Sequence, residues 1–294
     1  MEQSGHYYTV YFTSLAVGFS NGIALRQAML AQMPDQIENL DAYTLHVRHC
    51  IQAALGNQIA AANEWRFLVE YVLHSLPDNK TGNTRSADQS DVTYKLLLSN
   101  RPDSLEFGLL LHRLGDTYAH RIMHNPGRLY GTSEGMYDSC LPENMGHARD
   151  GNKPDYPFER ADIFCEYLGE LYDVLESKSL DRGSLLYRRN LGKGRILQKS
   201  DLVITLSGLL NNLTWDVSWY KKFFSSAFQA AFIHRIREQS LQSFGETMSD
   251  YAPEKEGTIT FDEYLKAHPD LRIDGYKIRD AINMIALGLQ INLP

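Results

Sequence analysis

The sequence contains few cysteines, with Cys50, Cys140 and Cys165 as the only three among 294 residues. Because the number is odd and no Cys-x-x-Cys spacing occurs, these residues cannot build a disulfide framework or a thiolate zinc site. Any metal ion that the protein holds must therefore be bound by nitrogen and oxygen ligands.

The chain also lacks an excess of positive charge. Its 29 Lys and Arg residues face 36 Asp and Glu residues, which gives a formal net charge of −7. This sign does not suit a protein that follows an extended phosphate backbone, although a local basic patch or a bound cation could override it.

Long apolar runs are missing, and the first residues carry no basic segment of the kind that opens a signal peptide. We therefore expect no transmembrane segment and, by default, a cytoplasmic location, with export by a leaderless route as the alternative. The sequence leaves the oligomeric state open.

Helical periodicity dominates the residues that are present, and no strand alternation or internal repeat stands out. Polar or Gly- and Pro-containing stretches predict loops at 78–90 and 125–157, and the second is too long for a simple connector. Helices are expected over 8–19, 23–33, 57–75, 104–124, 158–177, 199–213 and 214–242, with two short helices in 258–294. We predict an all-α bundle with a helical domain at 1–248 and a C-terminal helical appendage at 249–294.

The most informative pattern is a row of four polar residues in the expected helix over 104–124. His112, Asp116, His120 and His124 recur every four residues. Side chains four positions apart lie on one helix face, so neighbouring pairs can chelate an ion. His112 and His120 would be about 12 Å apart along the axis, too far to share one ion. An aspartate between them could instead bridge two ions about 3.5–4 Å apart.

Leucines flank this row and predict that the helix is buried. Buried imidazole and carboxylate groups need partners because an unpaired buried charge is costly, and a metal ion would satisfy all of them. The alternative is a solvated or internally hydrogen-bonded row that holds no metal.

Other candidate ligands lie outside the row. His6 opens the first helix, and His74 ends a helix, where it could equally serve as a C-terminal cap. Asp35 follows the helix over 23–33 and could equally be the N-cap of the next segment. The irregular segment contributes His147, Asp150 and Asp155. The remaining histidines are interpreted as surface or structural residues: His46, His49, His234 and His268.

Residues 252–263 match part of a calcium-binding EF-hand loop, with Gly257 at position 6 and Glu263 at position 12. The first position of such a loop normally supplies a side-chain oxygen. Here it is Ala252, so calcium binding is disfavoured.

Several of these residues together resemble a known signature. The central part is Gly115-Asp116-Thr117-Tyr118-Ala119-His120, preceded by His112 and followed by Gly146-His147-Ala148 and Pro154-Asp155. It resembles the signature of the zinc-dependent phospholipase C and S1/P1 nuclease superfamily. The beginning of the chain looks like a related uncharacterised bacterial family, through His6-Tyr7-Tyr8, Ala16-x-Gly18-Phe19 and Ala31-Gln32-x-x-Asp35. The resemblance covers roughly residues 5–170.

This resemblance implies an all-α fold whose helices converge on one to three zinc ions. The residues that it assigns to two of the ions are His6, Asp35, His74, His112 and Asp116, with Asp116 bridging. For the third ion it implies His120, His147 and a carboxylate, for which Asp155 is our choice. Asp150 is the alternative carboxylate, and His124 is the alternative histidine.

The chain departs from the superfamily pattern at two points. The secreted enzymes use an N-terminal tryptophan amine as a ligand, and this sequence has no such tryptophan. The pattern also has a carboxylate four residues after its last histidine, where Gly151 follows His147 here. We therefore expect either a remodelled third position or fewer ions.

The function implied by the resemblance is hydrolysis of an anionic phosphoester, such as a phospholipid or a nucleic acid, by a metal-activated water. Asp35 is the residue that we expect to orient or deprotonate that water. Two alternatives stay open. One is a helical interaction protein with a structural or vestigial metal site, and the other is a metal hydrolase of a non-phosphate bond.

Overall fold

The computed structural model describes residues 4–56, 60–77, 84–131, 146–147, 150, 153–181, 199–200, 203 and 258–291. These residues are mostly helical, and the single sheet found among them has two strands. The predicted all-α fold is therefore confirmed. Most of the predicted helices over 199–242 and the predicted boundary between 248 and 249 lie outside the described residues.

Two π-helical segments interrupt an otherwise α-helical order in the N-terminal half. The elements there are η1 (π-helix, Ser4–Tyr8), α1 (Thr9–Ala16), α2 (Asn21–Gln36), α3 (Ala42–Ala54), α4 (Ala60–Leu68), η2 (π-helix, Val69–Leu73), α5 (Ser86–Ser99) and α6 (Leu105–Ala119). They are followed by β1 (Arg121–Ile122), β2 (Asn125–Leu129), the short 3-10 helices η6 (Lys153–Asp155) and η7 (Pro157–Arg160), and α7 (Ala161–Asp181). The C-terminal elements are α12 (Phe261–Ala267), the 3-10 helix η8 (Pro269–Leu271) and α13 (Gly275–Gly288).

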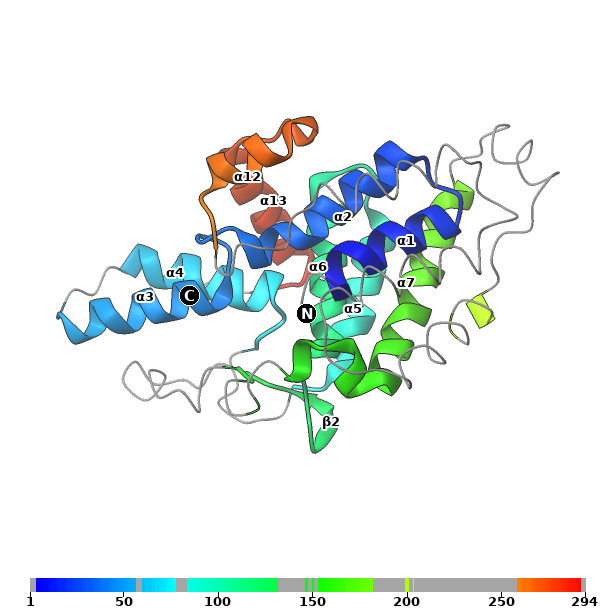
Figure 1. The fold of residues 1–294 in the computed structure, drawn as a ribbon. Helices are drawn as coiled ribbons and strands as arrows, with labels where there is room; N and C mark the ends of the chain where they lie inside the picture. Colours follow the sequence, from blue (N-terminus) through cyan, green and yellow to red (C-terminus); the bar gives the residue numbers. More distant parts are fainter. Residues whose placement is uncertain are drawn as a thin grey trace.

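Helix α6 lies at the centre of the bundle, between α2, α5 and α7, while the α3–α4 hairpin projects to one side (Figure 1). Ser104 begins α6 as predicted, because its hydroxyl accepts a hydrogen bond from the backbone N–H of Phe107. Every residue of α6 from Phe107 to Ala119 is buried. At Gly108 a Cβ atom would lie 2.2 Å from Cβ of Leu30, so the absence of a side chain lets α2 and α6 approach closely. The central helix is thus enclosed on all sides.

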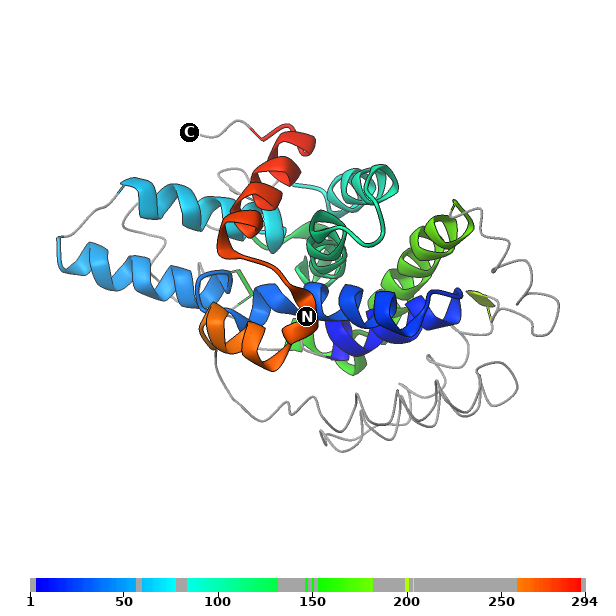
Figure 2. The same ribbon diagram turned by 90° about the horizontal axis from the view of Figure 1, so that it is seen from above.

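The C-terminal helices pack on the N-terminal ones (Figure 2). Tyr264 of α12 is fully buried, and its hydroxyl donates to the backbone oxygen of Met29 in α2 at 2.6 Å. Ile282 of α13 belongs to the same core. Ile259 pairs in parallel with Ile37, directly after α2. The two predicted short helices are therefore confirmed, and they share one hydrophobic core with the N-terminal bundle.

Helix α6 ends at Ala119, so the prediction of a helix as far as residue 124 was wrong. The chain turns back as a β-hairpin of β1 and β2, which the sequence pattern did not predict. The guanidinium of Arg160 donates to the backbone oxygens of Ala119 and Arg121, and the N–H of Tyr130 donates to the oxygen of His120. These donors satisfy carbonyls that another helical turn would otherwise have used. His124 consequently lies exposed in the hairpin turn.

Helix α2 includes Asp35, whereas the sequence predicted that Asp35 follows the helix. Pro34 lacks a backbone N–H, yet its fixed φ is compatible with the helix, which continues for two more residues to Gln36. The chain becomes extended only at Ile37, whose N–H donates to Met33. The predicted loop over 78–90 is also too long, because α5 already begins at Ser86.

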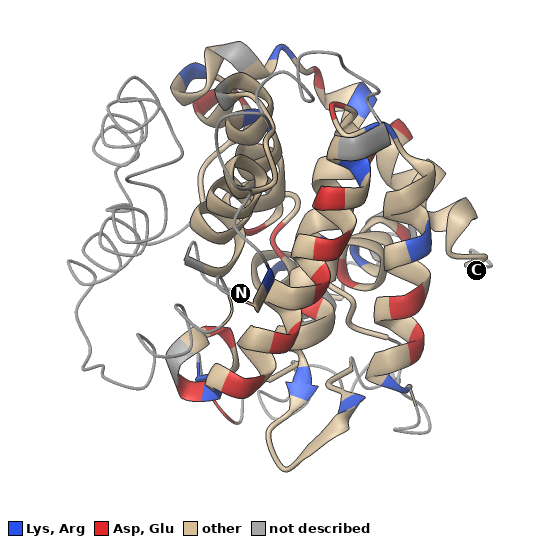
Figure 3. Cartoon of the chain, turned by 90° about the vertical axis from the view of Figure 1, so that its right-hand side faces the viewer, with Lys and Arg blue, Asp and Glu red and all other residues tan. Residues whose placement is uncertain are grey.

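Among the described residues, no helix combines the length and the apolarity needed to cross a membrane. Acidic residues recur along the helices on the side of the molecule that Figure 3 shows. Those on α7 include Asp162, Glu166, Glu170, Asp173 and Glu176. Cys50 in α3 is disulfide-bonded, whereas Cys165 in α7 is not. The chain therefore contains a disulfide, although three cysteines cannot build a disulfide framework.

Candidate metal centre

Helix α6 presents His112 and Asp116 one turn apart and ends with His120 as its C-cap. The side chains of His112 and Asp116 are 0% and 1% exposed, so both polar groups are removed from water. Because the surrounding face of α6 is apolar, their partners must come from the helices packed against it.

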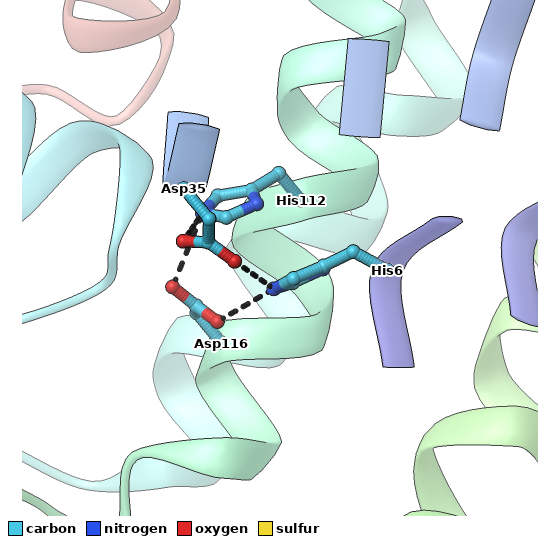
Figure 4. A group of neighbouring side chains, drawn as sticks. All are labelled: His6, Asp35, His112 and Asp116. Carbon is cyan, nitrogen blue, oxygen red and sulfur yellow. Dashed lines mark hydrogen bonds and ion pairs between the residues drawn. The ribbon is translucent and has the colours of Figure 1, made fainter. Parts of the chain in front are cut away.

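Four side chains form the first group, which we define as His6, Asp35, His112 and Asp116. One possible ligand atom of each lies within 4.8 Å of the others. Nε2 of His6 is 3.0 Å from Oδ1 of Asp116 and 3.5 Å from Oδ2 of Asp35. Nε2 of His112 is 3.2 Å from Oδ2 of Asp116 and 3.6 Å from Oδ1 of Asp35. The two carboxylates therefore face the two histidines across a small space (Figure 4).

His74 adjoins the first group from the end of η2. Its Nδ1 lies 3.1 Å from Oδ2 of Asp116, 3.6 Å from Oδ1 of Asp35 and 3.2 Å from Nε2 of His112. The two oxygens of each carboxylate thus face different histidines. Oδ1 of Asp116 faces His6, and Oδ2 faces His74 and His112. Asp35 and Asp116 thus lie between His6 on one side and His74 and His112 on the other.

Backbone carbonyls orient three of the histidines. Nδ1 of His112 is 2.7 Å from the oxygen of Ala31, and Nε2 of His74 is 2.8 Å from the oxygen of Leu40. Nδ1 of His120 is 2.6 Å from the oxygen of His74. Since a carbonyl can only accept, each of these nitrogens carries a proton and donates it. The opposite ring nitrogen is left for a ligand, which is the usual arrangement around metal-binding histidines.

His6 is held by close packing against α6. Its ring stacks on that of His112 with 4.0 Å between centroids. A Cβ atom at Gly115 would lie 2.8 Å from Cε1 of His6, so the glycine makes room for the imidazole. The hydroxyl of Tyr167 donates to the backbone oxygen of Gly5. His6 lies in η1 and His74 directly follows η2, and short π-helical segments are frequent at functional sites.

The second group, defined as His120, His147 and Asp155, lies beyond the end of α6. Its three possible ligand atoms are also within 4.8 Å of one another. Nε2 of His147 is 3.2 Å from Oδ2 of Asp155. Nδ1 of His120 is 4.0 Å from Oδ2 of Asp116, so the two groups adjoin. Of the open alternatives, Asp155 is the carboxylate that the fold brings here.

The most exposed members of the two groups indicate where solvent can reach them. The side chain of Asp35 is 24% exposed, whereas the other residues of the first group are at most 1% exposed. In the second group, His147 and Asp155 are 19% and 18% exposed. Solvent therefore reaches the first group at Asp35 and the second group at His147 and Asp155.

Burial and mutual contact change the protonation of these residues. Burial alone would lower the pKa of His74, but contact with the Asp116 carboxylate raises the pKa to about 9. Burial raises the pKa of Asp35 to about 6, and it lowers the pKa of His120 to about 4. Burial also lowers the pKa of His6 well below its ordinary value. At neutral pH, His6 and His120 are therefore neutral and have a lone pair for a ligand bond.

The donor set fits a transition-metal ion. Imidazole nitrogen and carboxylate oxygen are the ligands that zinc shares with other first-row metals when thiolates are absent. Two buried carboxylates side by side also repel each other, and a cation between them removes that cost. The cluster could therefore hold a metal ion, as the sequence predicted.

All eight predicted ligands are described, and they fall into these two groups with His74 beside the first. His124 and Asp150 do not join them: His124 is exposed, and the carboxylate of Asp150 accepts a hydrogen bond from the hydroxyl of Tyr130. His46, predicted as a surface or structural residue, is buried with Nδ1 at 3.4 Å from Oε1 of Glu70. Sequence reasoning missed the carbonyls of Ala31 and Leu40, since no residue type marks a backbone acceptor.

Comparison with known proteins identifies a family but no individual relative. No curated protein and no solved structure matches the chain. A family match covers residues 1–172, a range that contains all eight candidate ligands and ends before the C-terminal helices. Because this range is more than half of the chain, the protein belongs to the Family of unknown function (DUF6765).

Proposed function

We propose that the protein is a metal-dependent hydrolase of phosphoesters and that zinc is its metal. The observation that carries the proposal is the Asp116 carboxylate. Its two oxygens face separate histidines, at 3.0 Å from His6 and 3.1 Å from His74. A shared carboxylate of this kind is typical of paired metal ions, which act together on phosphoryl groups in many hydrolases.

Zinc is favoured by the ligand types. Imidazole nitrogens outnumber carboxylates in the two groups and His74 taken together, whereas Mg²⁺ and Ca²⁺ prefer oxygen ligands. When bound, the ions would lower the pKa of a coordinated water towards about 7 and neutralise charge on the phosphoryl oxygens. They would also overcome the net charge of −7, which would otherwise oppose an anionic substrate.

The protein's own groups would perform the positioning. His6, His74, His112 and Asp116 are buried and fix the geometry from α6 and the segments that pack on it. Backbone carbonyls hold His74 and His112 in one orientation, so little reorganisation is needed when substrate arrives.

Asp35 is our candidate for the residue that orients the attacking water and accepts its proton. It is the partly exposed member of the first group, so a water molecule and a substrate can reach it. In the protein without metal, burial raises its pKa to about 6, and bound cations would lower this pKa, so the carboxylate would be ionised and able to accept a proton at neutral pH.

A direct test measures zinc-dependent hydrolysis of bis(p-nitrophenyl) phosphate by the wild type and by Asp116→Asn. We expect activity that is lost on chelation, restored by zinc and abolished in Asp116→Asn. Glu106→Gln, in the first turn of the same helix, is the matched control and should remain active. Hydrolysis of an ester or amide without any phosphodiester hydrolysis would favour the non-phosphate alternative. Absence of bound metal would favour the interaction protein.

A further inference from the structure

Tyr130, which follows the β-hairpin, contacts both histidines of the second group. Its backbone N–H donates to the oxygen of His120 at 2.7 Å, so it ties the hairpin to the end of α6. Its ring packs edge-on against that of His147, with 6.1 Å between centroids. Tyr130 therefore lies between the two segments, far apart in sequence, that supply these ligands.

The hydroxyl of Tyr130 is also linked to His147 by hydrogen bonds through Asp150. The hydroxyl donates to Oδ2 of Asp150, and the N–H of Asp150 donates to the backbone oxygen of His147 at 2.8 Å. The same hydroxyl accepts a hydrogen bond from the N–H of Met123 at 3.1 Å. The hydroxyl thus has one donor and one acceptor partner, which fixes its direction and that of the Asp150 side chain.

We infer that Tyr130 is a positioning residue for a metal ion in the second group. Its hydroxyl, through Asp150, fixes the backbone at His147, and its N–H fixes His120, so both imidazoles keep the spacing that one ion requires. Tyr130 acts through Asp150 and through the backbone of His120, and it takes no part in the chemistry itself. The inference rests on the metal binding within the proposed function, and it assigns to Asp150 a supporting role instead of a ligand role.

The test compares Tyr130→Phe with the wild type in a titration of metal-free protein with Co²⁺, followed by its visible absorption. The phenylalanine keeps the ring and the backbone N–H but loses the bond to Asp150. Because groups that support metal ligands typically contribute about tenfold to a hundredfold in affinity, we expect one class of sites to weaken by that factor. The absorption of the first group should not change.

Two further variants make the result specific. Asp150→Ala removes the same bond from its other end and should weaken the same class of sites to a similar degree. Tyr172→Phe is the matched control, because its hydroxyl binds Glu176 within α7 and its loss should leave every class unchanged. Equal affinities in Tyr130→Phe and the wild type would overturn the inference, as would a uniform weakening of all classes.

The proposed function and this inference fail in different ways. Selective weakening in Tyr130→Phe, in a protein without phosphodiesterase activity, would support the inference and contradict the proposed function. Phosphodiesterase activity in the wild type, with unchanged metal affinities in Tyr130→Phe, would support the proposed function and contradict the inference. A wild type that binds no Co²⁺ would overturn both.

Discussion

Nε2 of His6 lies 3.0 Å from Oδ1 of Asp116, although 110 positions separate the two residues in the chain. The other oxygen of Asp116 faces His74, which comes from a third segment. The first group, together with His74, therefore exists only when η1, α2, η2 and α6 are packed together. A metal ion that binds it must favour the folded state over the unfolded chain.

Zinc should raise the thermal stability of the protein. A ligand at 100 times its Kd adds about 2.7 kcal/mol per site to the free energy of unfolding, which corresponds to several degrees in Tm. Differential scanning calorimetry of metal-free protein, with and without zinc, measures the effect. Magnesium at the same concentration is the control and should have little effect. A Tm that zinc leaves unchanged would contradict a folded-state metal site.

Metal binding should release a proton from His74. In the metal-free protein the Asp116 carboxylate overcomes the effect of burial and raises the pKa of His74 to about 9, so this residue is protonated at pH 7.5. A metal ion at Nδ1 must displace that proton. Isothermal titration calorimetry in buffers of different ionisation enthalpy counts the protons released. We expect the count at pH 7.5 to be lower in His74→Gln, and equal counts would argue against this ligand.

The same pKa predicts how the stability of the metal-free protein depends on pH. Because the pKa of His74 is raised on folding, its contribution is fully present below its ordinary pKa of about 6.5 and is lost as the pH rises through about 9. Urea unfolding of wild type and His74→Gln between pH 6 and 10 measures it. The stability difference between the two should shrink over this interval, and a constant difference would contradict the prediction.

Gly115→Ala should weaken metal binding by displacing His6. The new Cβ atom would lie 2.8 Å from Cε1 of His6, too close for the ring to stay in place. We expect one class of sites to lose affinity about tenfold to a hundredfold, together with a fall in kcat. Gly127→Ala in β2 is the matched control, because the nearest atom to its Cβ lies at 3.8 Å. Equal metal affinity in the two variants would contradict this role of Gly115.

The C-terminal helices should be essential to stability. Tyr264 is fully buried against α2, and truncation of a large buried aromatic side chain typically costs about 3–5 kcal/mol. Tyr264→Ala should lower the free energy of unfolding by that amount in a urea titration. Tyr276→Ala, at a side chain that is 87% exposed in α13, should change it by less than about 0.5 kcal/mol. Similar values for both would mean that these helices are not part of the core.

The sequence predicted the parts of the site that depend on local spacing. The four-residue interval between His112 and Asp116 determines that both lie on one helix face, whatever the rest of the fold does. The prediction that His120 lies one turn beyond Asp116 is also confirmed, because His120 is the C-cap of α6. The prediction that His124 continues the row was wrong, because hydrogen bonds from Arg160 and Tyr130 to backbone oxygens end the helix before it. Such long-range donors leave no periodic signal.

Two features of the site could not be predicted from residue spacing. Asp35 was expected after a helix because proline usually ends one, yet Pro34 is tolerated near the end of α2. Residue spacing alone also does not divide the candidates into the first and second groups, a division that only the superfamily resemblance implied. The division is a property of helix packing, and in particular of the close approach of His6 to Gly115.

The buried histidines and carboxylates are proposed to bind transition-metal ions through Asp116. Elemental analysis of protein expressed in zinc-supplemented medium, together with Asp116→Asn purified in the same way, tests it most directly. We expect two to three equivalents of zinc or another transition metal in the wild type and at most one in the variant. A wild type without such metal, or a folded Asp116→Asn with undiminished metal content, would contradict it.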